Sequence, residues 1–131
     1  MNYAMPLYLS DMPLYRKAMD IIYLSRNIST YLQHDLSYLS EDGQEDPNIY
    51  FTGDIIQQSN SLAPEIINAE REKFSDNKYK HVEALERLTY LLNRNCKRLE
   101  KSNSNGRDYL PLLRSELKKF RKLQRTWMLT L

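Results

Sequence analysis

The stretch that decides the fold is residues 105–131, NGRDYLPLLRSELKKFRKLQRTWMLTL. Its large apolar side chains recur at steps of three, four and finally seven residues, which is the spacing of one face of an amphipathic helix. These positions are Leu110, Leu113, Leu117, Phe120 and Trp127. An amphipathic helix buries such a face against other elements, so the stretch predicts a helix packed on further helices.

The other side of the same stretch carries basic residues at steps of four, three and four. They are Arg114, Lys118, Arg121 and Arg125, and Lys119 and Lys122 widen the row. Residues at these spacings lie along one edge of a helix. The sequence therefore predicts one helix with an apolar face and a cationic face.

Three earlier segments have the same helical periodicity. The expected helices span residues 12–40, 49–74, 78–101 and 108–130, after an N-terminal arm of residues 1–11. We expect Asp11 to cap the first helix and Asp108 the last, and Gly106 to take a left-handed conformation after the third. Pro64 falls inside the second segment, where we expect a kinked but continuous helix.

These four helices predict an all-α fold, an antiparallel up-down-up-down four-helix bundle. A length of 131 residues suits one domain, and only three glycines argue against a turn-rich β fold. Residues 40–48, SEDGQEDPN, read as an acidic loop. No segment resembles a membrane span or a secretory signal, so we expect a cytoplasmic protein with no membrane partner.

Charge is distributed unevenly along the chain. Residues 1–53 hold three basic and seven acidic side chains, whereas residues 54–131 hold sixteen basic and ten acidic ones. The net charge of +2 is thus the sum of −4 and +6. Such asymmetry permits one part of the fold to bind a polyanion.

The residues that catalysis would need are few. His34 and His81 are each expected at the surface, and Cys96 falls on the apolar seam of its helix with no histidine near it in sequence. A ribonuclease using Arg26 and His34 is a distant alternative. We expect a protein that is not an enzyme and that has no catalytic residue, metal site or cofactor.

The basic residues of the third helix are the second half of the candidate site. Arg87, Arg94, Arg98 and Lys101 share an edge, with Lys97 beside them. If this helix neighbours the last one, the two basic edges merge into a surface that contacts phosphates. Tyr90 and Tyr109 could stack bases there. The alternative is an ordinary solvated face on a bundle that only oligomerises or binds protein.

Three stretches carry a resemblance to a known family. They are LYRKAMDII at residues 14–22, SNSLAPEIINAEREKFSDNKYKHVEALERLTYLLNRNCKRL at residues 59–99, and RDYLPLLRSELKKFRKLQRTWMLTL at residues 107–131. In helix order and length the chain resembles the four-helix proteins of ribosomal-RNA intervening sequences and the accessory variability protein (Avd) of diversity-generating retroelements. Residues 68–72, NAERE, lack a glycine typical of the ribosomal group and so favour the retroelement group.

The resemblance implies a homo-oligomeric ring, a pentamer, that partners a reverse transcriptase and binds RNA or DNA. It implies a non-catalytic role in supporting mutagenic reverse transcription. The positions that match the basic surface of the family are Arg94, Lys97, Arg98, Arg114, Lys118, Arg121 and Arg125.

Overall fold

The computed structural model describes residues 7–131, and all regular structure within them is helical. The elements are η1 (Leu7–Asp11), α1 (Pro13–Leu36), α2 (Ile49–Asn60), α3 (Leu62–Arg71), α4 (Lys78–Leu99), η2 (Asn105–Tyr109) and α5 (Leu110–Met128). The predicted all-α class is confirmed for this part of the chain.

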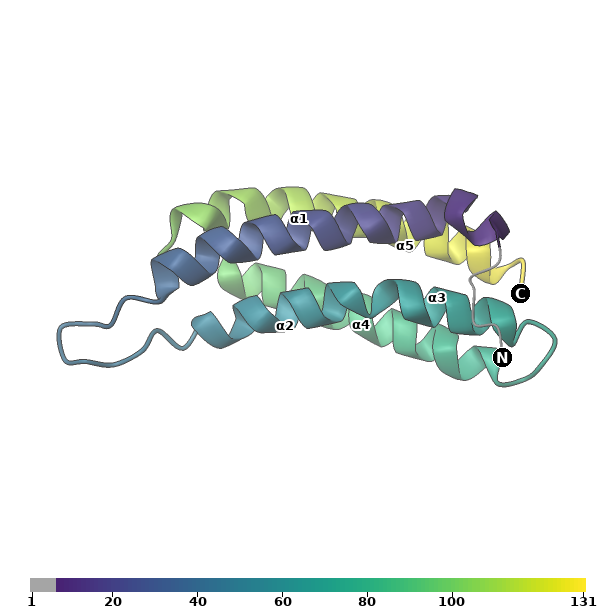
Figure 1. Ribbon diagram of the computed structural model, residues 1–131, viewed down its shortest axis with the longest axis horizontal. Helices are drawn as coiled ribbons and strands as arrows, with labels where there is room; N and C mark the ends of the chain where they lie inside the picture. Colours follow the sequence, from purple (N-terminus) through teal and green to yellow (C-terminus); the bar gives the residue numbers. More distant parts are fainter. Residues whose placement is uncertain (1–6) are drawn as a thin grey trace.

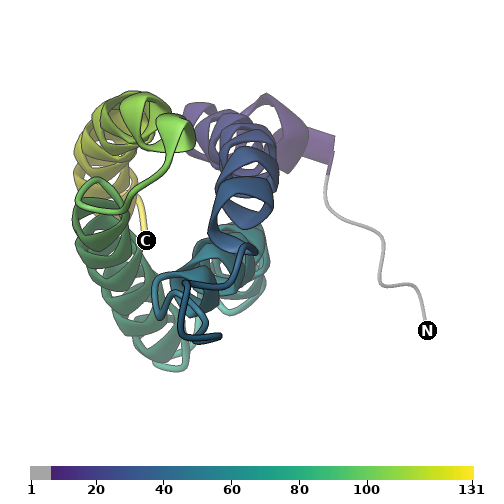
Figure 2. The same ribbon diagram turned by 90° about the vertical axis from the view of Figure 1, so that its left-hand side faces the viewer.

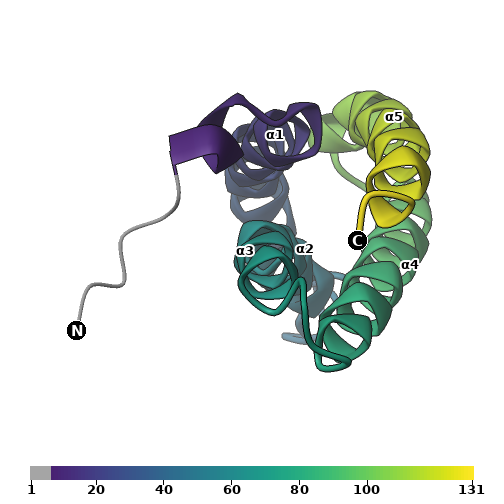
Figure 3. The ribbon, with the colours of Figure 1, turned by 90° about the vertical axis from the view of Figure 1, so that its right-hand side faces the viewer.

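The helices lie side by side along the long axis of the molecule (Figure 1). α1 packs on α2 and α5, and α4 packs on α2, α3 and α5. Seen from either end, α1, the α2 and α3 pair, α4 and α5 surround one interior (Figures 2 and 3). α5, the helix on which the prediction was based, thus lies between α1 and α4.

The interior is filled by the apolar positions that the periodicity predicted. Leu110, Leu113 and Phe120 are fully buried and Trp127 is 5% exposed, whereas Leu129 beyond it is 89% exposed. The C-terminal tail is therefore divided: Trp127 belongs to the core and Leu129 lies on the surface.

The second predicted helix, residues 49–74, is interrupted. α2 ends at Asn60 and α3 begins at Leu62, although Ser61 between them keeps right-handed helical angles. Pro64 explains the position of the break, because it has no N–H to donate to the carbonyl of Asn60 four residues earlier. The two helices remain in line (Figure 1), and α3 ends at Arg71 rather than at residue 74.

Other helix ends also differ from the prediction. α1 ends at Leu36 instead of residue 40, where the Ser37 hydroxyl donates to the His34 carbonyl over 2.8 Å and turns the chain. α4 ends at Leu99 instead of residue 101. The last helix spans 110–128 instead of 108–130, because residues 105–109 form the tighter η2 turn.

The N-terminal arm and the two predicted caps need correction. Of the arm, residues 1–6 lie outside the described residues, and residues 7–11 form η1 with Leu9 fully buried. Met12, not Asp11, occupies the cap position of α1, since Asp11 pairs instead with Arg16 at 3.0 Å. Tyr109, not Asp108, precedes α5.

Gly106 has no positive φ, so its predicted left-handed conformation is wrong. Its role is a close approach to α1: a Cβ at this position would lie 3.1 Å from Cβ of Tyr31 and 3.3 Å from the amide nitrogen of Leu32. Asp35 holds the same contact, because its Oδ2 accepts from the Ser104 hydroxyl at 2.6 Å and from the Asn105 amide at 3.1 Å. The end of α1 is thereby fastened to the start of α5.

We expect this fastening to depend on pH. The Ser104 hydroxyl, and next the backbone amides of residues 105 and 106, lower the pKa of Asp35, although partial loss of water opposes them. A lowered pKa stabilises the fold above the unfolded value of about 4 and loses that contribution as pH falls through the folded value. Urea unfolding should therefore show Asp35→Asn to be less stable than wild type at pH 7, with the difference becoming smaller as pH falls below about 4. A difference that persists unchanged at pH 3 would contradict this account.

A candidate nucleic-acid interface between α4 and α5

A shallow groove of about 520 Å³ runs between α4 and α5. Six of its ten lining residues are lysine or arginine, and none is acidic. The lining residues are Asn93, Lys97, Pro111, Arg114, Ser115, Leu117, Lys118, Arg121, Lys122 and Arg125. We call this surface the basic groove.

The core packing of α5 determines which way these cations face. Leu117 and Phe120 are buried on one side of the helix. Residues three and four positions apart share a face. Arg114, Lys118 and Arg121 therefore stay together on the α4 side as long as the core face is buried. Burial of the apolar face therefore keeps these basic residues of α5 directed toward α4.

Most of these charges are not neutralised by the protein. Arg114 is the exception, since its Nε lies 2.6 Å from Oε1 of Glu100. Within residues 7–131, the other five cations have no acidic oxygen within 4.0 Å; they are Lys97, Lys118, Arg121, Lys122 and Arg125. Like charges gathered in one groove raise the local positive potential and attract anions.

The structure brings five of the seven predicted site residues into the basic groove and leaves two outside it. Arg94 and Arg98 do not line the groove, although both are exposed. The guanidinium of Arg98 lies instead 4.9 Å from the ring centre of Phe51 on α2. One residue step turns a helix by about 100°, so Arg98 points to a different neighbour from Lys97. The two predicted edges therefore merge only through Lys97.

Lys122 joins the groove although it was expected only to widen the row. It stands four residues after Lys118, and this spacing was the available signal. Lys119 lies on the opposite side of α5, where it contacts Glu116 at 3.2 Å. Glu116 also accepts from Lys17 of α1 at 2.7 Å, so the α1 side of α5 is charge-balanced.

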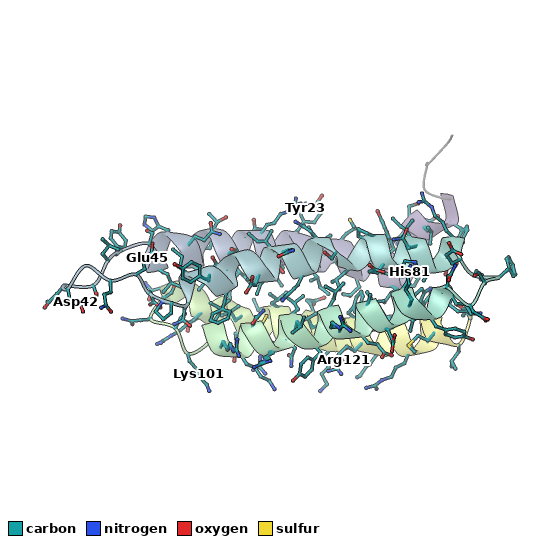
Figure 4. All side chains as sticks on the ribbon, turned by 90° about the horizontal axis from the view of Figure 1, so that it is seen from below. Tyr23, Asp42, Glu45, His81, Lys101 and Arg121 are labelled. Carbon is teal, nitrogen blue, oxygen red and sulfur yellow. The ribbon has the colours of Figure 1, made fainter. Side chains whose placement is uncertain are left out.

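The acidic residues of the loop after α1 lie away from this groove. In Figure 4, Asp42 and Glu45 stand at one end of the molecule, whereas Arg121 lies along the side formed by α4 and α5. The acidic loop is thus separated in space from the basic groove.

The candidate catalytic groups are scattered. His34 is exposed on α1, whereas His81 is partly buried and its Nδ1 lies 2.7 Å from Oε2 of Glu65. The expectation of a surface position therefore fails for His81. Among residues 7–131 no cluster of three or more metal-ligating side chains occurs.

Cys96 is fully buried, and this burial makes a prediction about its reactivity. Burial, and to a lesser degree the nearby Glu100, raise the pKa of its thiol to about 12. Only the thiolate reacts with disulfide reagents. We expect Ellman's reagent at pH 8 to label no thiol in the native protein and one thiol after denaturation in guanidinium. Rapid labelling of the native protein would show that this part of the core opens.

Comparison with protein-family models, with curated proteins and with solved structures finds no match to this chain. None of the helices within residues 7–131 is long and apolar enough to cross a membrane.

Proposed function

We propose that this protein binds nucleic acid without catalysis, by holding the phosphate backbone in the basic groove between α4 and α5. The observation that carries the proposal is a groove with six lysine and arginine side chains on its lining and no acidic residue. Five of these cations have no acidic partner within 4.0 Å among residues 7–131. Cationic side chains that the protein itself leaves unpaired are available to phosphates.

The chemistry of the groove favours contacts with the backbone over the reading of sequence. Lysine and arginine bind phosphate oxygens, and such contacts position a strand without identifying its bases. Arg121 and Arg125 can each offer a planar pair of N–H donors to one phosphate. We therefore expect binding that is strong at low salt and tolerant of sequence.

The family resemblance extends this proposal to a biological role. In this role the protein is an up-down-up-down bundle that assembles into a homo-oligomeric ring, expected to be a pentamer. It is the accessory protein of a diversity-generating retroelement, and it binds the reverse transcriptase and its RNA or DNA in the cytoplasm. The basic groove would then present the nucleic acid to the polymerase while the polymerase carries out the chemistry.

A salt titration tests the binding proposal. Fluorescence anisotropy with labelled oligonucleotides gives the association constant between about 50 and 300 mM salt. Five phosphate contacts predict a slope of log K against log salt of about −3.5 for single strands and about −4.5 for duplex. Absence of binding at the lowest salt, or a slope near zero, would refute the proposal.

A second candidate function is an oligomeric bundle that binds only protein. Adjacent exposed apolar side chains favour it, since Tyr38 is 69% exposed and Leu39 next to it is 62% exposed. Exposed apolar clusters of this kind are frequent at protein interfaces. A stable oligomer by sedimentation, with no affinity for nucleic acid at about 50 mM salt, would select this function over the first.

A further inference from the structure

A second hollow, on the opposite side of α5, is aromatic and not basic. It has a volume of about 580 Å³ and lies between α1 and Tyr109 at the end of η2. Its lining residues are Leu24, Asn27, Ile28, Thr30, Tyr31 and Tyr109, none of which is charged. We call it the tyrosine pocket.

Two tyrosine rings in this pocket are already arranged for stacking. The rings of Tyr31 and Tyr109 have their centres 6.1 Å apart, with 24° between their planes. Both remain accessible, since Tyr31 is 61% exposed and Tyr109 is 50% exposed. A pair of nearly parallel, exposed rings offers a flat surface to another planar group.

The pocket also contains an amide that is free to recognise such a group. Within residues 7–131, no hydrogen-bond partner is found for the exposed side chain of Asn27. An asparagine amide offers a donor and an acceptor together, which matches the edge of a nucleobase. Ile28 is 2% exposed and adds an apolar surface to the pocket.

The tyrosine pocket and the basic groove lie on either side of the first half of α5. A third hollow, of about 550 Å³, lies between them, and its charged residues Lys17, Asp20, Glu116 and Lys119 pair with one another. It shares Leu24 and Asn27 with the tyrosine pocket and Ser115 with the basic groove. A strand bound in the groove can therefore reach the tyrosine pocket by crossing one helix, whose diameter with side chains is about 10–12 Å.

We propose that the tyrosine pocket receives an unpaired base of a single-stranded nucleic acid whose phosphates lie in the basic groove. This inference rests on the proposed function and adds the substrate class: single strand in preference to duplex. Bases within a duplex are stacked on one another, so only an unstacked base can present its face to Tyr31 and Tyr109. The basic groove across α5 from the pocket favours nucleic acid over a protein as the occupant.

Affinities for single-stranded and duplex oligonucleotides of equal length test the proposal. Tyr31→Ala and Tyr109→Ala should each weaken single-strand binding about 5- to 150-fold, which corresponds to the loss of one stacked base. Duplex binding should stay unchanged, and this unchanged affinity also shows that the variants fold. Tyr31→Phe is the matched control, because it keeps the ring and should bind the single strand like wild type. An abasic strand should bind wild type and Tyr31→Ala equally.

Each other outcome overturns the inference without being confused with failure of the proposed function. If Tyr31→Ala leaves single-strand affinity unchanged while wild type still binds with a steep salt slope, the groove functions without the pocket. If the substitution instead dissociates an oligomer and leaves single-strand affinity intact, the pocket is a contact between protein chains. If wild type binds neither strand form at low salt, the proposed function fails first and the inference fails with it.

Discussion

Replacing Lys118, Arg121 and Arg125 together by glutamine should weaken binding to RNA or DNA about a hundredfold at about 0.1 M salt. Each cation in contact with a phosphate contributes about 1 kcal/mol in water, and three such losses amount to about 3 kcal/mol. The slope of log K against log salt should also become shallower by about two for single strands. Anisotropy titrations of the variant beside wild type measure both quantities.

The chain offers a matched control with the same loss of charge. Arg16, Arg26 and Lys80 are exposed and lie outside the basic groove. Their joint replacement by glutamine removes three charges but should change affinity by less than about threefold, because net charge alone acts weakly through salt. Equal weakening by both triple variants would mean that binding follows total charge and not the groove.

Trp127→Ala should lower the free energy of unfolding by about 4 kcal/mol, the cost of removing a large buried aromatic side chain. Trp127 is 5% exposed and its Nε1 donates to Oε1 of Glu70 over 2.7 Å. The other oxygen of Glu70 accepts from the hydroxyl of Tyr8 at 3.0 Å. Burial, together with this bond to Glu70 and its negative charge, raises the pKa of Tyr8, so the phenol remains a donor at neutral pH. The cluster ties η1, α3 and α5 together, and urea unfolding measures its contribution.

Two milder variants separate the hydrogen bond from the packing. Trp127→Phe keeps most of the apolar volume but leaves a carboxylate oxygen of a residue that is 8% exposed without its donor, so about 1–3 kcal/mol should be lost. Glu70→Gln keeps an acceptor for the indole and should cost less than Trp127→Phe. If Trp127→Ala unfolds the chain outright, the order of these two variants still tests the cluster. A Trp127→Phe variant as stable as wild type would show that the bond to Glu70 contributes nothing.

The helical class and the inward faces were accessible from sequence because they follow from periodicity. Leu110, Leu113 and Phe120 repeat at helical steps, and burial depends on that repeat alone. Helix ends were harder to predict from sequence, because nearby side chains compete with the helix for backbone hydrogen bonds. The Ser37 hydroxyl, for example, donates to the His34 carbonyl at the end of α1, while Ser40, three residues downstream, was an equally plausible end from sequence.

The candidate site could also be predicted in part from helical spacing. The row on α5 lies on one helix, so its spacing alone predicted that Arg114, Lys118, Arg121 and Arg125 share one edge, and all four line the basic groove. The contribution of α4 depends on how that helix is rotated against α5, and the rotation brings Lys97 into the groove while Arg98 contacts Phe51. Tyr109 was a stacking candidate from sequence, but its pairing with Tyr31 was hidden, because the two are 78 positions apart and meet through the packing of Gly106 on α1.

Lysine footprinting tests the central claim most directly, because it locates the bound strand. The protein is acetylated briefly with and without a saturating oligonucleotide, and mass spectrometry gives the labelling rate of each lysine. Lys97, Lys118 and Lys122 line the basic groove and should be protected, whereas Lys80, which is exposed outside it, should label at an unchanged rate. Binding of the oligonucleotide with no protection of Lys97, Lys118 and Lys122 would contradict the claim that the α4 and α5 groove holds nucleic acid.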